Sequence, residues 1–110
     1  MGDYKNAVKE LGDFDGKGTS LGSMAQGALG QALMESGDNA KAIEAFKKAT
    51  ADAGDEMVTP MFLYQLGLAY EASNNAAEAK NAFKRIREEF PKSAQAREIE
   101  KDLARLGELN

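Results

Sequence analysis

The sequence contains no cysteine and no histidine, and each absence removes a class of function. Without cysteine the chain has no disulfide, no thiolate nucleophile and no thiolate metal site. Without histidine it lacks the commonest general base and the commonest zinc ligand. Ser-His-Asp, Cys-His and HExxH chemistry are therefore excluded, and an enzyme built from this chain would have to use carboxylates, lysine or tyrosine.

Long apolar runs are also missing. No stretch approaches the roughly 20 apolar residues that a membrane-spanning helix needs, and no charged segment followed by an apolar one indicates a signal peptide. The 110 residues are 43% hydrophobic and 29% charged, which is typical of one ordinary globular domain.

Charge is unevenly distributed along the chain, whose net charge is −4. Residues 1–79 carry 6 basic and 12 acidic side chains, whereas residues 80–105 carry 8 basic and 5 acidic ones. The basic segment fits either a patch for phosphate or an acidic partner, or solvated helix faces with i,i+4 ion pairs, and we favour the second interpretation. The acidic overall balance argues against nucleic acid as the main ligand.

One segment recurs at a fixed spacing of 37 positions. The first copy, LGQALMESGDNAKAIEAFKKA, begins at Leu29, and the second, LGLAYEASNNAAEAKNAFKRI, begins at Leu66. A repeat of this length indicates stacked helical hairpins, so we look for a binding surface before a catalytic centre. Residues 2–11 (GDYKNAVKEL) match the second half of the unit at residues 37–46. We therefore expect a fragment of a longer protein; a natural short protein with an unusual capping helix is the alternative.

Apolar periodicity and turn residues predict six helices. Gly37 ends one helix, Thr59 and Pro60 begin another as N-cap and first-turn proline, and Pro91 interrupts the chain before a last helix opened by Ser93. The expected ranges are about 3–12, 20–36, 39–52, 59–73, 76–90 and 93–106.

The repeated positions resemble those of the tetratricopeptide repeat family. Leu29-Gly30 and Leu66-Gly67 supply its leucine and glycine, and Pro91 supplies the closing proline. The family has a small residue in the second helix of each repeat, and Ala7, Ala42 and Ala79 match it. The large residue four positions later is matched by Leu11, Phe46 and Phe83. The resemblance implies that each glycine faces an alanine across its hairpin, and that Phe46 and Phe83 fill the gap between neighbouring hairpins.

The resemblance implies an all-α fold of antiparallel helical hairpins, stacked as a short right-handed solenoid with a C-terminal capping helix. It divides a single domain of residues 1–110 into the end of a truncated repeat with its loop, two repeats and the cap. The boundaries are 1–19, 20–56, 57–93 and 94–110. The sequence departs from the family pattern at Gln26, Gly54 and Ile86, and the loop between the repeats is three residues longer than usual.

A weaker resemblance, carried by GDYKNAVKEL and FPKSAQAREIEKDLARL, is to envelope-associated repeat proteins of Gram-negative bacteria. It implies a location at the periplasmic face of the inner membrane through an anchor outside this chain; the alternative is the cytoplasm.

Residues 12–18 (GDFDGKG) are similar to both a calcium loop and a phosphate loop. Lys17 stands at a ligand position of the calcium loop and Met24 replaces its bidentate glutamate. The phosphate-loop spacing is one residue short, and no strand precedes it. We therefore expect an inter-repeat turn, with no metal, no cofactor and no catalytic residues.

In tetratricopeptide arrays the first helices of the repeats line a concave groove. The resemblance places these residues in the groove: Met24, Ala28, Gln31, Glu35, Met61, Tyr64, Gln65, Leu68 and Glu71. The groove set contains no lysine or arginine, so the chain is not expected to bind the C-terminal carboxylates of chaperone tails. It suits an apolar or basic peptide segment or a partner helix. Alternatively, a preceding helix or a second copy of the chain covers some of these positions.

The sequence therefore predicts a non-enzymatic protein-interaction module or scaffold, whose partner is a protein or peptide. The first alternative is a self-associating structural domain, a homodimer through the N-terminal edge around Val8 and Leu11. The second is an enzyme built on carboxylates, which would need buried carboxyl groups with shifted pKa values.

Overall fold

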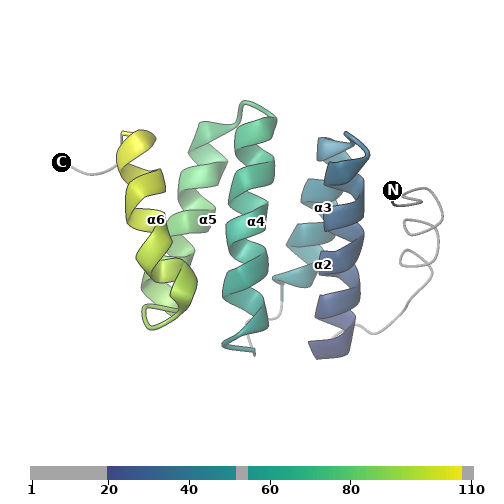
Figure 1. Ribbon diagram of the computed structural model, residues 1–110, viewed down its shortest axis with the longest axis horizontal. Coiled ribbons are helices and arrows are strands. Elements are labelled where there is room, and N and C mark those ends of the chain that lie inside the picture. The colour runs from purple at the N-terminus through teal and green to yellow at the C-terminus, as the bar shows by residue number, and fades with distance from the viewer. Residues whose placement is uncertain (1–19, 52–54, 108–110) are drawn as a thin grey trace.

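The computed structural model describes residues 20–51 and 55–107, which form helices joined by short connections (Figure 1). These are α2 (Ser20–Glu35), α3 (Asn39–Ala49), α4 (Val58–Ala72), α5 (Ala76–Glu89) and α6 (Ala94–Arg105). The described part of the chain contains no strand, so the all-α prediction is confirmed. The helix predicted over residues 3–12 and the loop at 12–18 lie outside the described residues.

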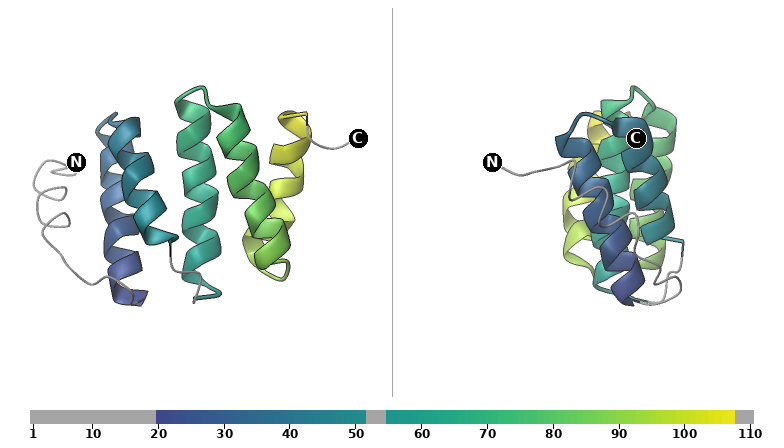
Figure 2. Two further views of the ribbon diagram at one scale, coloured as in Figure 1. Left: turned by 180° about the vertical axis from the view of Figure 1, so that it is seen from behind. Right: turned by 90° about the vertical axis from the view of Figure 1, so that its right-hand side faces the viewer.

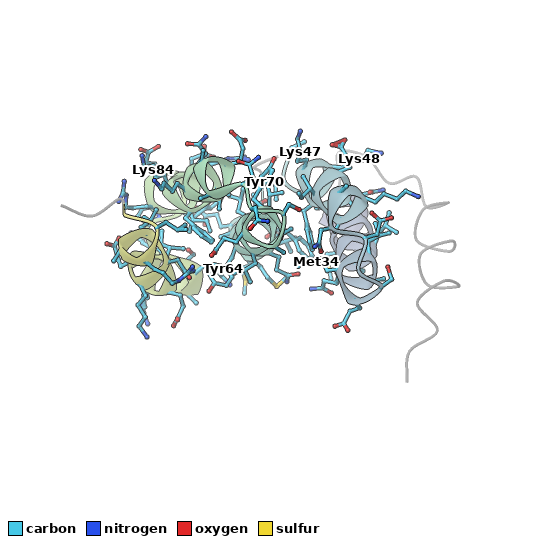
Figure 3. The ribbon with its side chains drawn as sticks, turned by 90° about the horizontal axis from the view of Figure 1, so that it is seen from above. Met34, Lys47, Lys48, Tyr64, Tyr70 and Lys84 are labelled. Carbon is cyan, nitrogen blue, oxygen red and sulfur yellow. The ribbon has the colours of Figure 1, made fainter. Side chains whose placement is uncertain are left out.

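The helices form two layers. Helices α2, α4 and α6 lie on one side, and α3 and α5 lie on the other (Figures 2 and 3). Helix α4 is central, because it contacts each of the other four helices. The α2–α3 and α4–α5 hairpins stack side by side, and α6 packs at the end of the row, as the resemblance implied.

The two hairpin turns are built in the same way. Gly37 (φ 88°) and Asn74 (φ 60°) take up the left-handed conformation after the first helix of each hairpin. The next residue then caps the second helix. The Asp38 carboxylate accepts the Lys41 N–H at 3.1 Å, and the Asn75 side chain accepts the Glu78 N–H at 3.3 Å. The 37-residue repeat therefore includes the turn as well as the helices.

Removal of the Asp38 cap should destabilise the domain moderately. We expect Asp38→Ala to lower the free energy of unfolding by about 1 kcal/mol, because the first-turn amide loses its acceptor. Asp38→Asn keeps a capping oxygen and should cost clearly less. Urea denaturation measures both changes, and equal losses in the two variants would show that the cap is not the cause.

Helix α4 begins differently from the prediction. Thr59 was expected to be the N-cap, but the helix starts at Val58 and Thr59 is buried in its first turn. The Asp55 carboxylate accepts the N–H groups of Met57 and Val58, both at 2.8 Å, and so satisfies amides that precede the predicted start. Pro60 still occupies the first turn, where its missing N–H is not needed.

Helix α3 ends a few residues earlier than predicted, at Ala49. The Thr50 hydroxyl donates to the Phe46 carbonyl at 2.9 Å, and side-chain bonds of this kind compete with continuation of the helix. The Thr50 carbonyl accepts a hydrogen bond at 3.1 Å from the Arg85 guanidinium, which links the end of α3 to α5 of the next hairpin.

Gly30 and Gly67 each face an aromatic ring of the paired helix, which the sequence did not predict. A Cβ atom built on Gly30 would lie 2.6 Å from the Phe46 ring, and one on Gly67 would lie 2.3 Å from the Phe83 ring. The missing side chains thus make room for a phenylalanine within each hairpin. The Phe46 ring of α3 stacks on the Phe62 ring of α4, with 6.3 Å between the ring centroids, and so joins the two hairpins as predicted. The ring contact of Phe83 is with Tyr64, within its own hairpin.

Candidate functional site

All the predicted groove residues come from α2 and α4, on the layer shared with α6. We call this side of the molecule the α2–α4–α6 face. Figure 3 shows Tyr64 on this face, whereas Lys47, Lys48 and Lys84 lie on the α3–α5 side. The exposed members of the predicted set are Met24, Gln31, Glu35 and Leu68, and the half-buried members are Ala28, Met61, Tyr64, Gln65 and Glu71.

Tyr64 joins the predicted set to the last helix. Its ring lies 5.5 Å from the Phe83 ring, measured between centroids. Partial burial raises the pKa of the Tyr64 phenol, and the Asp102 carboxylate, which accepts a hydrogen bond from its hydroxyl, raises it further. Glu98 and Glu71 act in the same direction. The Tyr64 hydroxyl therefore lies in the electrostatic field of carboxylates from α4 and α6.

The raised pKa of Tyr64 can be measured directly. Each nearby carboxylate repels the phenolate, so we expect Tyr64 to ionise above the ordinary value of about 10. The difference between the ultraviolet pH titrations of wild type and Tyr64→Phe isolates this residue from the other tyrosines. Asp102→Asn should lower the pKa of Tyr64, whereas Glu100→Gln, on the same helix, should leave it unchanged. Identical titrations for all variants would contradict the arrangement.

Arg105 of α6 binds Glu71, one of the predicted groove residues. Its guanidinium donates to both Glu71 carboxylate oxygens and, at 2.8 Å, to Asp102. These hydrogen bonds raise the pKa of Arg105 further above its already high ordinary value. Glu71 is thus held by the capping helix, although the sequence analysis treated it as available to a ligand.

The contribution of α6 to this face was missed. Glu98, Asp102 and Arg105 lie 37 positions after Met61, Gln65 and Leu68, so one more step of the repeat spacing finds them. They were overlooked because a polar helix after the last repeat resembles a solvent cap. The predicted groove set contains no lysine or arginine, but Arg105 of α6 lies beside it. Since two carboxylates already hold its guanidinium, exclusion of carboxylate tails stays a prediction.

A cavity of about 680 Å³ opens where α4 begins and the chain turns from α5 into α6. Its apolar walls are formed by Met57, Met61, Phe90, Pro91 and Ala94. Phe90 is buried, whereas Met57 is 82% exposed. Met61 belongs both to this cavity and to the predicted groove set, so the cavity adjoins the α2–α4–α6 face. We call it the Met57–Phe90 cavity. No sequence pattern predicts this cavity.

A smaller cavity of about 270 Å³ lies between α3 and α5, with Leu63, Leu66 and Tyr70 of α4 among its lining residues. Within residues 20–51 and 55–107, no three acidic side chains are grouped so as to hold a metal ion. None of the described helices has the length and apolar character needed to cross a bilayer. Val8 and Leu11 lie outside the described residues, so self-association through them stays a prediction.

The observed fold is a short helical-repeat array, in which hairpins stack and a single helix follows them. Two family profiles, both described as tetratricopeptide repeat, match residues 1–56 and 62–93. The chain belongs to the tetratricopeptide repeat family. Repeats of this family generally mediate protein–protein interaction, and its members are typically non-enzymatic scaffolds. The matches give no support to the weaker resemblance to membrane-anchored envelope proteins. No curated protein and no solved structure matches the chain.

Proposed function

We propose that this domain binds a peptide segment or helix of a partner protein on the α2–α4–α6 face. One observation carries the proposal. Among the described residues, the large hydrophobic side chains that are exposed are Met24, Met57 and Leu68. All of them belong to α2 or to α4 and its N-cap, and none belongs to α3, α5 or α6. Their restriction to the neighbouring helices α2 and α4 and the N-cap of α4 supports an interaction site on this layer.

The charge distribution supports the same face. Helix α2 contains no charged residue before Glu35, and α4 contains none before Glu71. By contrast, α3 and α5 carry lysine and glutamate along their outer sides, for example Lys47 with Glu44 and Arg85 with Glu89. Where α2 and α4 form this face it is almost uncharged and carries methionines, so a partner that displaces its water there desolvates few charges; the charged part of the face is formed by Glu71 and α6.

The test uses a double substitution that leaves the core intact. Met24 is 50% exposed and Leu68 is 37% exposed, so Met24→Glu with Leu68→Glu places two charges on the face without removing a buried side chain. The matched control is Ala40→Glu with Ala77→Glu, which adds the same charges at exposed positions of α3 and α5.

Short random peptides displayed on phage are selected on the immobilised wild-type protein, and synthetic copies are then measured by fluorescence anisotropy. We expect the face variant to weaken binding by at least about tenfold, because buried unpaired charges each cost more than about 1 kcal/mol. The control variant should bind like wild type. Equal binding by the two variants, or the absence of any selected peptide, would contradict the proposal.

A further inference from the structure

We infer that the segment bound on the α2–α4–α6 face carries two recognition elements: a large apolar side chain that enters the Met57–Phe90 cavity, and a lysine or arginine that pairs with the carboxylates around Tyr64. This inference rests on the proposed function and makes the chemistry of the partner specific. It also predicts the spacing between the two elements.

The cavity is suited to an apolar side chain. Its volume of about 680 Å³ can hold one aromatic or branched side chain, and methionine, phenylalanine, proline and alanine line it together with the uncharged polar residues Ser93 and Gln95. Methionine adapts its shape to irregular guests and makes favourable contacts with aromatic rings. Met57 is 82% exposed in the free protein. Its burial by a guest side chain would therefore add a favourable free energy of transfer from water.

The charged residues that line the cavity are all exposed to solvent. They are Glu56, Glu89 and Lys92. The Glu89 carboxylate is already bound by Arg85, with 3.1 Å between Arg85 Nε and Glu89 Oε2. The apolar interior therefore selects the guest side chain, and these exposed charges can remain in water when the guest is bound.

The surroundings of Tyr64 favour a cation. Glu71, Glu98 and Asp102 all act on its hydroxyl, and Arg105 is the guanidinium that pairs with Glu71 and Asp102. Three carboxylates against one guanidinium leave an excess of two negative charges. Glu98 is exposed and pairs with no cation within the described ranges. A lysine or arginine of the partner would supply the complementary charge.

The two elements lie a short distance apart. Met61 at the cavity and Tyr64 are less than one turn apart on α4. Helix α6, which carries Glu98 and Asp102, is one interaxial distance away, about 8–10 Å. An extended peptide advances about 3.3 Å per residue, so the apolar and basic residues of the partner should be separated by about three positions.

The selection described above tests this inference with two further variants. Met57→Glu places a charge on the wall of the cavity at an exposed position, with Ala77→Glu as its control. Glu98→Gln removes the unpaired carboxylate, with Glu100→Gln as its control because Glu100 is an exposed glutamate of the same helix that does not act on Tyr64. Each selected peptide is also made with its basic residue replaced by alanine.

We expect peptides that require Met24 and Leu68 to share a large apolar residue and a lysine or arginine about three positions apart. Met57→Glu should weaken their binding by about tenfold, and Glu98→Gln by about three- to tenfold. Both controls should bind like wild type. The alanine version of a peptide should bind wild type and Glu98→Gln equally, because the charge pair is then already absent.

Three results would overturn the inference. Peptides that require Met24 and Leu68 but lack the apolar–basic pair, or that respond equally to Glu98→Gln and Glu100→Gln, would refute it and leave the proposed function standing. A concentration-dependent dimer in light scattering that Met57→Glu abolishes would assign the cavity to a second copy of the chain. If no selected peptide depends on Met24 and Leu68, the proposed function and the inference both fail.

Discussion

Phe83→Ala should lower the free energy of unfolding by about 3–5 kcal/mol, the usual loss for a buried phenylalanine truncated to alanine. Phe83 is completely buried, its ring lies over Gly67, and it supports the ring of Tyr64. Truncation removes its transfer free energy and leaves a cavity between α4 and α5, because Gly67 has no side chain that could fill the space.

Urea or thermal denaturation of the purified domain measures the loss. Met57→Ala is the control, since Met57 is 82% exposed and a surface truncation should change stability by less than about 0.5 kcal/mol. If Phe83→Ala lost no more stability than Met57→Ala, the packing of Phe83 on Gly67 would be wrong.

Gly67→Ala should also destabilise the domain, by about 1–3 kcal/mol, because an added methyl group overpacks a filled core. The sign of this change in stability distinguishes overpacking from helix propensity. Alanine is intrinsically better than glycine in a helix by about 1 kcal/mol, so propensity alone predicts stabilisation. A Cβ atom on Gly67 would lie 2.3 Å from Cε1 of the buried Phe83 ring, closer than any real contact. We therefore expect the cost of this clash to exceed the gain in helix propensity.

A double-mutant cycle isolates this clash. Phe83→Leu shortens the side chain that meets position 67, so Gly67→Ala should cost less in the Phe83→Leu background than in wild type. Denaturation midpoints of the four proteins give the coupling free energy. An increase in stability on Gly67→Ala, or strict additivity with Phe83→Leu, would contradict the predicted contact.

The order and extent of the described helices were predictable because their signals are local. Gly37 and Asn75 mark turn and cap positions, and Phe46 and Ile99 follow the helical period of buried residues. The errors arose where a choice depends on a distant or competing group. Asp55 reaches the amides before Thr59 and moves the start of α4. A glycine accommodates either an alanine or a ring, and only packing decides that Phe83 crosses to Gly67.

The candidate site was predictable in position but not in its contacts. The repeat pattern indicated the face of α2 and α4, where Met24 and Leu68 are exposed. It did not indicate that Arg105 binds Glu71, because that pair joins residues 34 positions apart through the packing of α6 on α4. The Met57–Phe90 cavity likewise depends on how Glu56 and Met57, before α4, meet the α5–α6 turn.

The central claim, that the α2–α4–α6 face binds a partner segment, is tested most directly by nuclear magnetic resonance. Backbone amide shifts of the isotope-labelled protein are recorded as a selected peptide is added. We predict that the largest changes fall on residues 24–31, 61–68 and 98–105, with small changes along α3 and α5. Changes concentrated on α3 and α5 would place the binding site on the opposite side and contradict the account.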